Sequence, residues 1–137
     1  MDIKKCTGYF HDGTLIGIYQ KKNSLELFLE SCQITSGEFV DEKILSKAGT
    51  LKGKLCLTGI KNIKVGDKEY TGILRKEYDD GEILHLEIGN NKVLLLVEWK
   101  NFPPKPRIRD VGKIEIEAEK IYWENIPDLS DNCCNEN

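Results

Sequence analysis

Residues 81–100 have the sequence GEILHLEIGNNKVLLLVEWK, and this stretch indicates how the chain folds. Its first half alternates apolar and polar side chains, which places Leu84 and Ile88 on the same face of a strand. The turn at residues 89–91 then leads into a second strand, Lys92–Trp99. Two short strands joined by a tight turn form an antiparallel β-hairpin.

Strand patterns of this kind occur along most of the chain. The predicted strands are Thr14–Gln20, Ser24–Ile34, Thr50–Val65, Tyr70–Tyr78, Glu82–Ile88, Lys92–Trp99 and Lys113–Trp123. Short connections place consecutive strands side by side and antiparallel. The sequence therefore predicts an all-β fold, an antiparallel meander of about seven or eight strands that forms a sandwich or a barrel. At most one short helix is expected, near residues 38–48.

Turn residues separate these strands. Asp12-Gly13 and Gly66-Asp67 favour tight turns that need a positive φ. Asp79-Asp80-Gly81 is expected to form a three-residue loop with a glycine bulge. Beside Gly59, the apolar pattern of the long strand slips by one residue, which predicts a β-bulge or a break.

The chain of 137 residues has the size of one domain, which we expect over residues 1–129, followed by a polar, frayed tail at 130–137. We expect a cytoplasmic protein, because no apolar run reaches bilayer length and the first residues contain no secretory signal. The five cysteines are an odd number without C-x-x-C spacing, which favours reduced thiols. Cys133 and Cys134 leave a redox or metal role open beside that of an inert tail.

The charge is distributed unevenly along the chain. The net charge is −3, but residues 1–68 carry +3 and residues 69–137 carry −6. An acidic C-terminal half repels phosphate and attracts basic partners. We therefore expect no nucleic-acid partner and no membrane contact, and a protein partner with a basic surface.

The last predicted strand supplies the candidate partner-binding surface. This surface comprises Glu115, Glu117, Glu119, Tyr122, Trp123 and Glu124. The first three glutamates alternate with apolar residues, which places them on one exposed face. Aromatic rings next to charges are typical of protein-binding surfaces. A merely solvated face is the alternative interpretation.

Two further features are secondary candidates. The proline-rich stretch 101–107 predicts a stiff connection, and Phe102, Arg107 and Arg109 in and beside it form a possible anchor with a basic rim. The strand Lys92–Trp99 is apolar on both faces, because Leu94 and Leu96 oppose its inner residues. Those two leucines are expected to be covered within the chain or, alternatively, by a homodimer contact.

The sequence offers little for catalysis. His11 and His85 are the only histidines, and no nucleophile motif accompanies them. We expect no catalytic residues, no metal site and no cofactor.

Three functions are compatible with these observations. The first is a small binding protein that acts through protein–protein contact. Its concrete version is an immunity-type neutraliser that masks a basic toxin surface. The second is a β-barrel that carries a small apolar ligand. The third is an enzyme with a Cys/His or carboxylate site.

Overall fold

The computed structural model describes residues 2–35, 42–108 and 110–128, which form mainly β-strands. The strands are β1 (Thr14–Lys21), β2 (Ser24–Glu30), β3 (Lys52–Val65), β4 (Lys68–Glu69), β5 (Asp80–Ile88), β6 (Lys92–Lys100) and β7 (Asp110–Asn125). The described helices are short 3-10 turns: η1 (Ile3–Lys5), η2 (Thr7–Phe10) and η3 (Glu42–Ile44). None of the helices in these ranges is long and apolar enough to cross a membrane. The predicted all-β fold is confirmed.

Six strands close into a barrel. Their order is β2-β1-β5-β6-β7-β3, and β3 pairs back onto β2 to complete the ring. The two-residue strand β4 extends β3 outside this ring. All neighbouring strands are antiparallel, as the short connections predicted. Of the two architectures that the sequence left open, the chain adopts the barrel.

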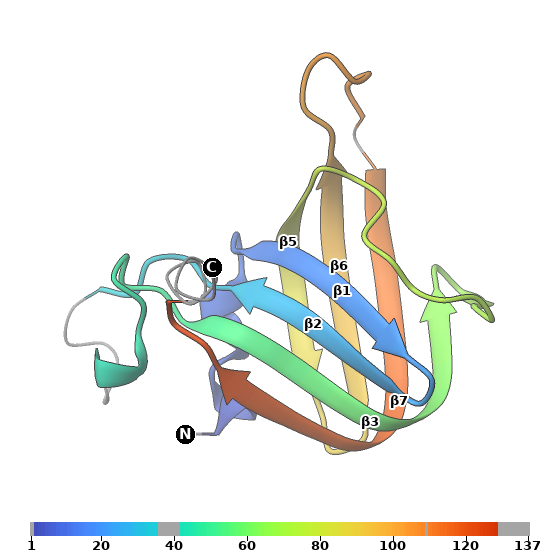
Figure 1. Ribbon diagram of the computed structural model, residues 1–137, viewed down its shortest axis with the longest axis horizontal. Coiled ribbons are helices and arrows are strands. Elements are labelled where there is room, and N and C mark those ends of the chain that lie inside the picture. Colours follow the sequence, from blue (N-terminus) through green and yellow to red (C-terminus); the bar gives the residue numbers. More distant parts are fainter. Residues whose placement is uncertain (1, 36–41, 109, 129–137) are drawn as a thin grey trace, which may run out of the picture.

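The barrel consists of two three-stranded meanders. β1, β2 and β3 form one, and β5, β6 and β7 form the other, and the two cross as layers in Figure 1. Two seams join them, β3 with β7 and β1 with β5. The chain passes from the first meander to the second between β4 and β5, so the predicted meander is interrupted once.

The predicted strand Tyr70–Tyr78 is wrong. Residues 70–79, here called the crossover segment, have no ladder pairing and run beside β1. The Leu74 N–H donates to Gln20 Oε1 at 2.6 Å, and Lys76 Nζ donates to the Ile16 carbonyl at 3.1 Å. Both hydrogen bonds involve a side chain, so they do not produce a strand.

The positive φ angles expected at two of the tight turns are confirmed. Asp12 has φ 66° and Gly66 has φ 68°, as the two tight turns require. Gly59 has φ 67°, and the β3–β7 register shifts between Ile60 and Asn62. The bulge predicted from the slipped apolar pattern is therefore present.

The start of β5 differs from its prediction. The loop expected at Asp79-Asp80-Gly81 is wrong, because β5 begins at Asp80 and Gly81 pairs with Trp99 on β6. A register shift between Ile83 and His85 then changes which side chains face inward. Ile83 is fully buried, whereas Leu84, expected on the inner face with Leu86 and Ile88, is only half-buried.

Large side chains fill the barrel interior. The fully buried ones are Phe10, Leu15, Leu25, Leu27, Leu29, Leu51, Leu55, Leu57, Ile83, Leu95, Ile114 and Ile116. At one end, Phe10 of η2 packs edge-to-face on Trp123, with 5.7 Å between ring centroids. At the other end, Tyr78 stacks on Trp99 at 5.3 Å. The inward positions that an apolar ligand would need are occupied by the protein's own residues.

Some predictions fall at or beyond the limits of these elements. β2 ends at Glu30 rather than Ile34, so Cys32, expected within a strand, lies after it and is exposed. The helix expected near residues 38–48 appears as η3. Arg109 and the tail at 130–137, with both its cysteines, lie outside the described residues.

Candidate protein-binding surface

The strand register aligns one row of outward residues across four strands. Tyr19 on β1 pairs with Glu26 on β2, Glu26 pairs with Cys56 on β3, and Cys56 pairs with Tyr122 on β7. Adjacent strands are about 4.8 Å apart, so the two tyrosines stand about 14 Å from each other along the row. Tyr19 is 54% exposed and Tyr122 is 51% exposed.

Tyr19 was missed as a site residue, although a signal for it exists. It directly follows the buried Ile18, so strand alternation places its ring on the outer face. What the sequence does not contain is the pairing of β1 and β7 with the intervening strands. Only that pairing places Tyr19 in the same row as Tyr122.

The centre of the row is packed rather than open. Phe28 is buried although it points outward, and Lys54 Nζ lies 5.8 Å from the centroid of its ring. Lys54 also pairs with Glu26, with 3.5 Å between Nζ and Oε1. This arrangement holds the lysine stem over apolar surface while its charge remains paired. The two tyrosines therefore flank a firm, partly apolar centre.

The Cys56 thiol, in the middle of the row, is buried and has a raised pKa. Burial raises the pKa of the Cys56 thiol, and the nearby carboxylate of Glu26 raises it further. The pKa of Tyr122 is also raised, first by its proximity to Cys56 and then by desolvation. Both groups therefore remain protonated at neutral pH, and Tyr122 presents a neutral hydroxyl.

Glu115 is neutralised by lysines. Its carboxylate lies 3.2 Å from Lys113 Nζ and 3.7 Å from Lys92 Nζ, and the side chain is 18% exposed. A hydrogen bond from Lys113 is the largest cause that holds the pKa of Glu115 below its usual value. Lys92 lies on β6 and Lys113 on β7 itself. The first glutamate of the candidate partner-binding surface therefore does not offer a free charge to a partner.

The other three glutamates of the predicted surface remain exposed. Glu117, Glu119 and Glu124 point outward along β7 and form no ion pair within residues 2–35, 42–108 and 110–128. Glu119 lies across from Gly59, where an added Cβ would come within 2.8 Å of the glutamate side chain. Three carboxylates without an ion pair to any described residue thus lie on the same strand as Tyr122.

Trp123 does not share this face, contrary to the prediction. β7 changes phase at Glu119 and Lys120, which are both exposed, so that Ile121 and Trp123 turn inward. The Trp123 ring packs on Phe10, and its indole N–H donates to Asn125 Oδ1 at 3.2 Å. The expected pair of exposed rings is therefore reduced to Tyr122.

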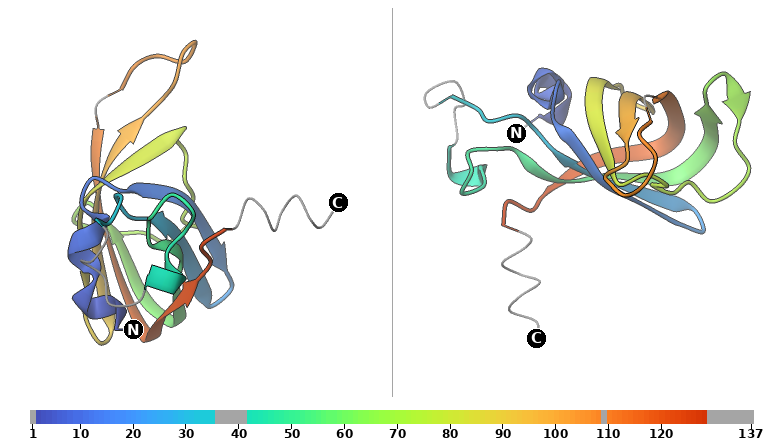
Figure 2. Two further views of the ribbon diagram at one scale, coloured as in Figure 1. Left: turned by 90° about the vertical axis from the view of Figure 1, so that its left-hand side faces the viewer. Right: turned by 90° about the horizontal axis from the view of Figure 1, so that it is seen from above.

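The β6–β7 loop carries two of the secondary candidates. It projects beyond the barrel in Figure 2, with Phe102 54% exposed, and Phe102 and Arg107 line one hollow. Asp79 fixes the loop base, because its carboxylate accepts from the Phe102 N–H at 2.7 Å and from Lys105 Nζ at 2.6 Å. The loop is therefore an anchored projection, well separated along the chain from Tyr122.

Leu94 and Leu96 lie on the outer face of β6 and are half-buried. Leu94 pairs with Glu87 and Glu115, so the chain's own long side chains flank it on both sides. Cover within the chain is the alternative that this arrangement favours. The homodimer contact remains a prediction.

The histidines do not join a nucleophile in the described structure. Cys32 Sγ donates to the His11 carbonyl at 3.3 Å, while the His11 ring contacts the Leu84 carbonyl through Nδ1 at 2.6 Å and Asp12 through Nε2 at 3.7 Å. His85 pairs with Glu87 at 3.0 Å. Within the part of the chain that the structure describes, no cluster of three or more metal-ligating side chains occurs.

Comparison with known proteins adds no relative. No protein-family model, no curated protein and no solved structure matches this chain.

Proposed function

We propose that this protein is a small binding protein that acts through protein–protein contact, with its binding face on the outside of β7. The supporting observation is that Glu117, Glu119 and Glu124, which form no ion pair with any described residue, lie exposed on the strand that also exposes Tyr122. Tyrosine supplies contact area at low entropic cost, and exposed carboxylates supply charge complementarity. Tyr19 extends this face along the row described above.

The partner that suits this face is a protein with a basic surface. The unpaired carboxylates attract lysine and arginine side chains over distance and accelerate association at low ionic strength. A neutraliser of the immunity type is the concrete form of this proposal, because such a protein works by masking a basic surface. The protonated Tyr122 hydroxyl adds a hydrogen-bond donor beside these carboxylates.

The test compares the wild-type protein with a charge-reversed variant, Glu117→Lys with Glu119→Lys. Both are used as bait in extract of the host cell, and each retained polypeptide is then purified and titrated against both baits. We expect the variant to lower the affinity at least about tenfold, because like charges facing each other in an interface cost several kcal/mol. The matched control is Glu69→Lys with Glu87→Lys, which changes the charge equally on β4 and β5.

The result that supports the proposal is a polypeptide that binds the wild type and the control with equal, salt-sensitive affinity and the variant weakly. A polypeptide that binds all three equally removes this face from consideration. Loss of binding by the control as well as by the variant attributes the effect to net charge, and this also contradicts the proposal.

A further inference from the structure

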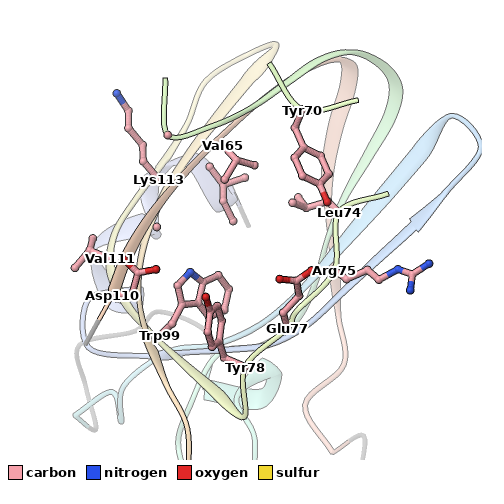
Figure 3. Close-up of a pocket in the computed structure, with 13 residues that line it drawn as sticks. Val65, Tyr70, Leu74, Arg75, Glu77, Tyr78, Trp99, Asp110, Val111 and Lys113 are labelled. Carbon is pink, nitrogen blue, oxygen red and sulfur yellow. The ribbon is translucent and has the colours of Figure 1, made fainter. Parts of the chain in front are cut away.

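A pocket lies at the end of the barrel opposite η2. It has a volume of about 380 Å³ and is lined by the end of β3, the end of β6, the start of β7 and the crossover segment. Figure 3 shows Tyr70 and Leu74 on one side and Trp99 and Tyr78 on another. Its size is near the lower end of the range of small-molecule sites. It lies inside the barrel mouth, so it is separate from the proposed protein-binding face.

Trp99 forms the floor of this pocket and is held in a slot between two glycines. An added Cβ on Gly81 would lie 3.0 Å from its ring, and one on Gly112 would lie 2.5 Å from its Nε1. Trp99 is only 7% exposed. Any side chain at Gly112 would block the indole N–H, so the glycine keeps that donor open.

The Trp99 N–H has no partner in residues 2–35, 42–108 and 110–128, unlike the N–H of Trp123. No side-chain nitrogen or oxygen in these ranges is both fully buried and unpaired, so this N–H keeps some accessible surface. Figure 3 shows the Trp99 nitrogen directed toward the space between the lining side chains. A donor that is open within a nearly buried residue is suited to an acceptor atom of a ligand.

Two carboxylates face the same space. Asp110 is the cross-strand partner of Trp99, Glu77 approaches from the crossover segment, and both residues are exposed. In Figure 3 both carboxyl groups point into the pocket. Neither forms an ion pair with a described residue. The pocket is thus lined by two exposed carboxylates that form no ion pair with a described residue.

The two cationic residues of the lining are directed elsewhere. The Arg75 guanidinium and Lys113 Nζ both point away from the pocket in Figure 3. Lys113 is paired with Glu115 at 3.2 Å and with Asp67 at 3.7 Å. The charge that faces the pocket is therefore negative, although the lining residues include both signs.

We propose that this pocket binds a small organic cation whose ammonium group lies close to an acceptor oxygen. The carboxylates of Asp110 and Glu77 and the aromatic walls attract the ammonium group, which is the usual chemistry of organic-cation recognition. The Trp99 N–H donates to the oxygen. A neutral sugar would use the donor and the aromatic rings but would leave both carboxylates uncompensated.

Choline is a suitable probe, because it combines a quaternary ammonium with a hydroxyl oxygen. Its control is dimethylbutanol, the neutral isostere in which a tert-butyl group replaces the trimethylammonium group. Each is titrated into nitrogen-labelled protein at millimolar concentration while NMR records the two indole N–H signals. We expect choline to shift the Trp99 signal with saturation and to leave that of Trp123 unchanged. Dimethylbutanol is expected to shift neither.

Three variants sharpen this test. Asp110→Asn and Glu77→Gln preserve shape and remove one charge each, and each is expected to weaken choline binding by about three- to fivefold, as for exposed charge pairs. The matched control, Glu117→Gln, removes a carboxylate from β7 outside the pocket and is expected to bind choline like the wild type. The proposal is overturned if choline shifts both indole signals alike, shifts neither, or is matched by dimethylbutanol. The proposal is also overturned if Glu117→Gln weakens choline binding as much as the two pocket variants do.

Discussion

The two seams of the barrel differ greatly in their construction. β7 is paired along β3 over almost the whole of both strands, from Gly53 to Val65 on the β3 side. β1 and β5 share one described ladder pair, Thr14 with Glu82. Hydrogen bonds from the Asp12 N–H and from the Ile83 N–H, each 2.8 Å long, support that second seam at its start. Beyond this point the crossover segment takes the place of a strand.

This difference separates the molecule into a regular region and an adaptable one. A continuous ladder fixes side-chain positions on both of its faces, and the proposed protein-binding face lies on the outside of the β3–β7 seam. The β1–β5 seam has one ladder pair and two further backbone hydrogen bonds. The crossover segment is held to β1 by hydrogen bonds that involve side chains, and it forms one wall of the pocket. Regions with few backbone ladder bonds open locally at lower free energy than paired strands.

The largest loss of stability is expected when a buried side chain at the β3–β7 seam is shortened. Ile116 is fully buried and pairs with Ile63 and Val93, so Ile116→Ala should reduce the free energy of unfolding by about 2–5 kcal/mol. Leu74→Ala in the crossover segment should cost less, about 2 kcal/mol, because this segment can relax into the space. Urea unfolding of both variants measures the difference.

An exposed neighbour provides the control for these truncations. Ile73 is 55% exposed, so Ile73→Ala should change the stability by no more than about 0.5 kcal/mol. If Leu74→Ala proves as costly as Ile116→Ala, the two seams contribute equally and the distinction drawn above is wrong.

An intermediate effect is expected at the hydrogen bond between the crossover segment and β1. Gln20→Ala removes the acceptor of the Leu74 N–H and should cost about 1 kcal/mol. Hydrogen exchange of the Leu74 amide should become faster, while that of Leu57 in β3 should change only as much as global stability does. Gln20→Glu keeps an acceptor and serves as the control. An unchanged exchange rate at Leu74 would show that this bond does not hold the segment.

The smallest effect is the loss at low pH of the hydrogen bonds by which Asp79 joins the crossover segment to the β6–β7 loop. A hydrogen bond from Lys105 and then one from the Phe102 N–H hold the pKa of Asp79 below its ordinary value of 3.8. Because the folded-state pKa is the lower one, this anchor is fully present above the ordinary value and is lost as pH falls below 3.8 through the folded pKa. The Phe102 amide signal should follow this titration in NMR spectra.

The variant Asp79→Asn tests the assignment. It removes the titrating group, so the Phe102 amide should lose its pH-dependent step below the ordinary pKa. A step that persists in the variant, or one that occurs above the ordinary value in the wild type, contradicts the assignment of the anchor to Asp79.

Local patterns predicted most of the strands and their antiparallel neighbours correctly, but not how the barrel closes. The alternation of apolar and polar residues identified β7, and the slip of the apolar pattern beside Gly59 identified the bulge in β3. Tyr70–Tyr78 has strand-like composition, but each of its two hydrogen bonds to β1 involves one side chain, so no backbone ladder forms. Barrel closure depends on β2 and β7 both pairing with β3, which is a property of distant segments and not of any local pattern.

The candidate surface was only partly predictable for similar reasons. The outward direction of Glu117 and Tyr122 follows from strand alternation, and the structure agrees with it. The inward turn of Trp123 follows from the phase change at Lys120, which no turn residue announces in the sequence. The ion pair of Glu115 with Lys113, two residues earlier on the same strand face, also follows from alternation, whereas its pairing with Lys92 on β6 becomes visible only after strand pairing is known.

Closure of the barrel also limits how this protein can engage any other chain. Many complexes form when a peptide adds itself as a strand to an open sheet. In the part of the chain that the structure describes, the ring of six strands leaves the two-residue β4 as the terminal strand of the sheet order. Such a short segment offers few main-chain groups to an incoming strand. Strand addition is therefore confined to the edges of β1 and β5 beyond Thr14 and Glu82. On the β3–β7 side recognition relies on side chains, so partner specificity there can change by substitution on the surface without any change to the scaffold.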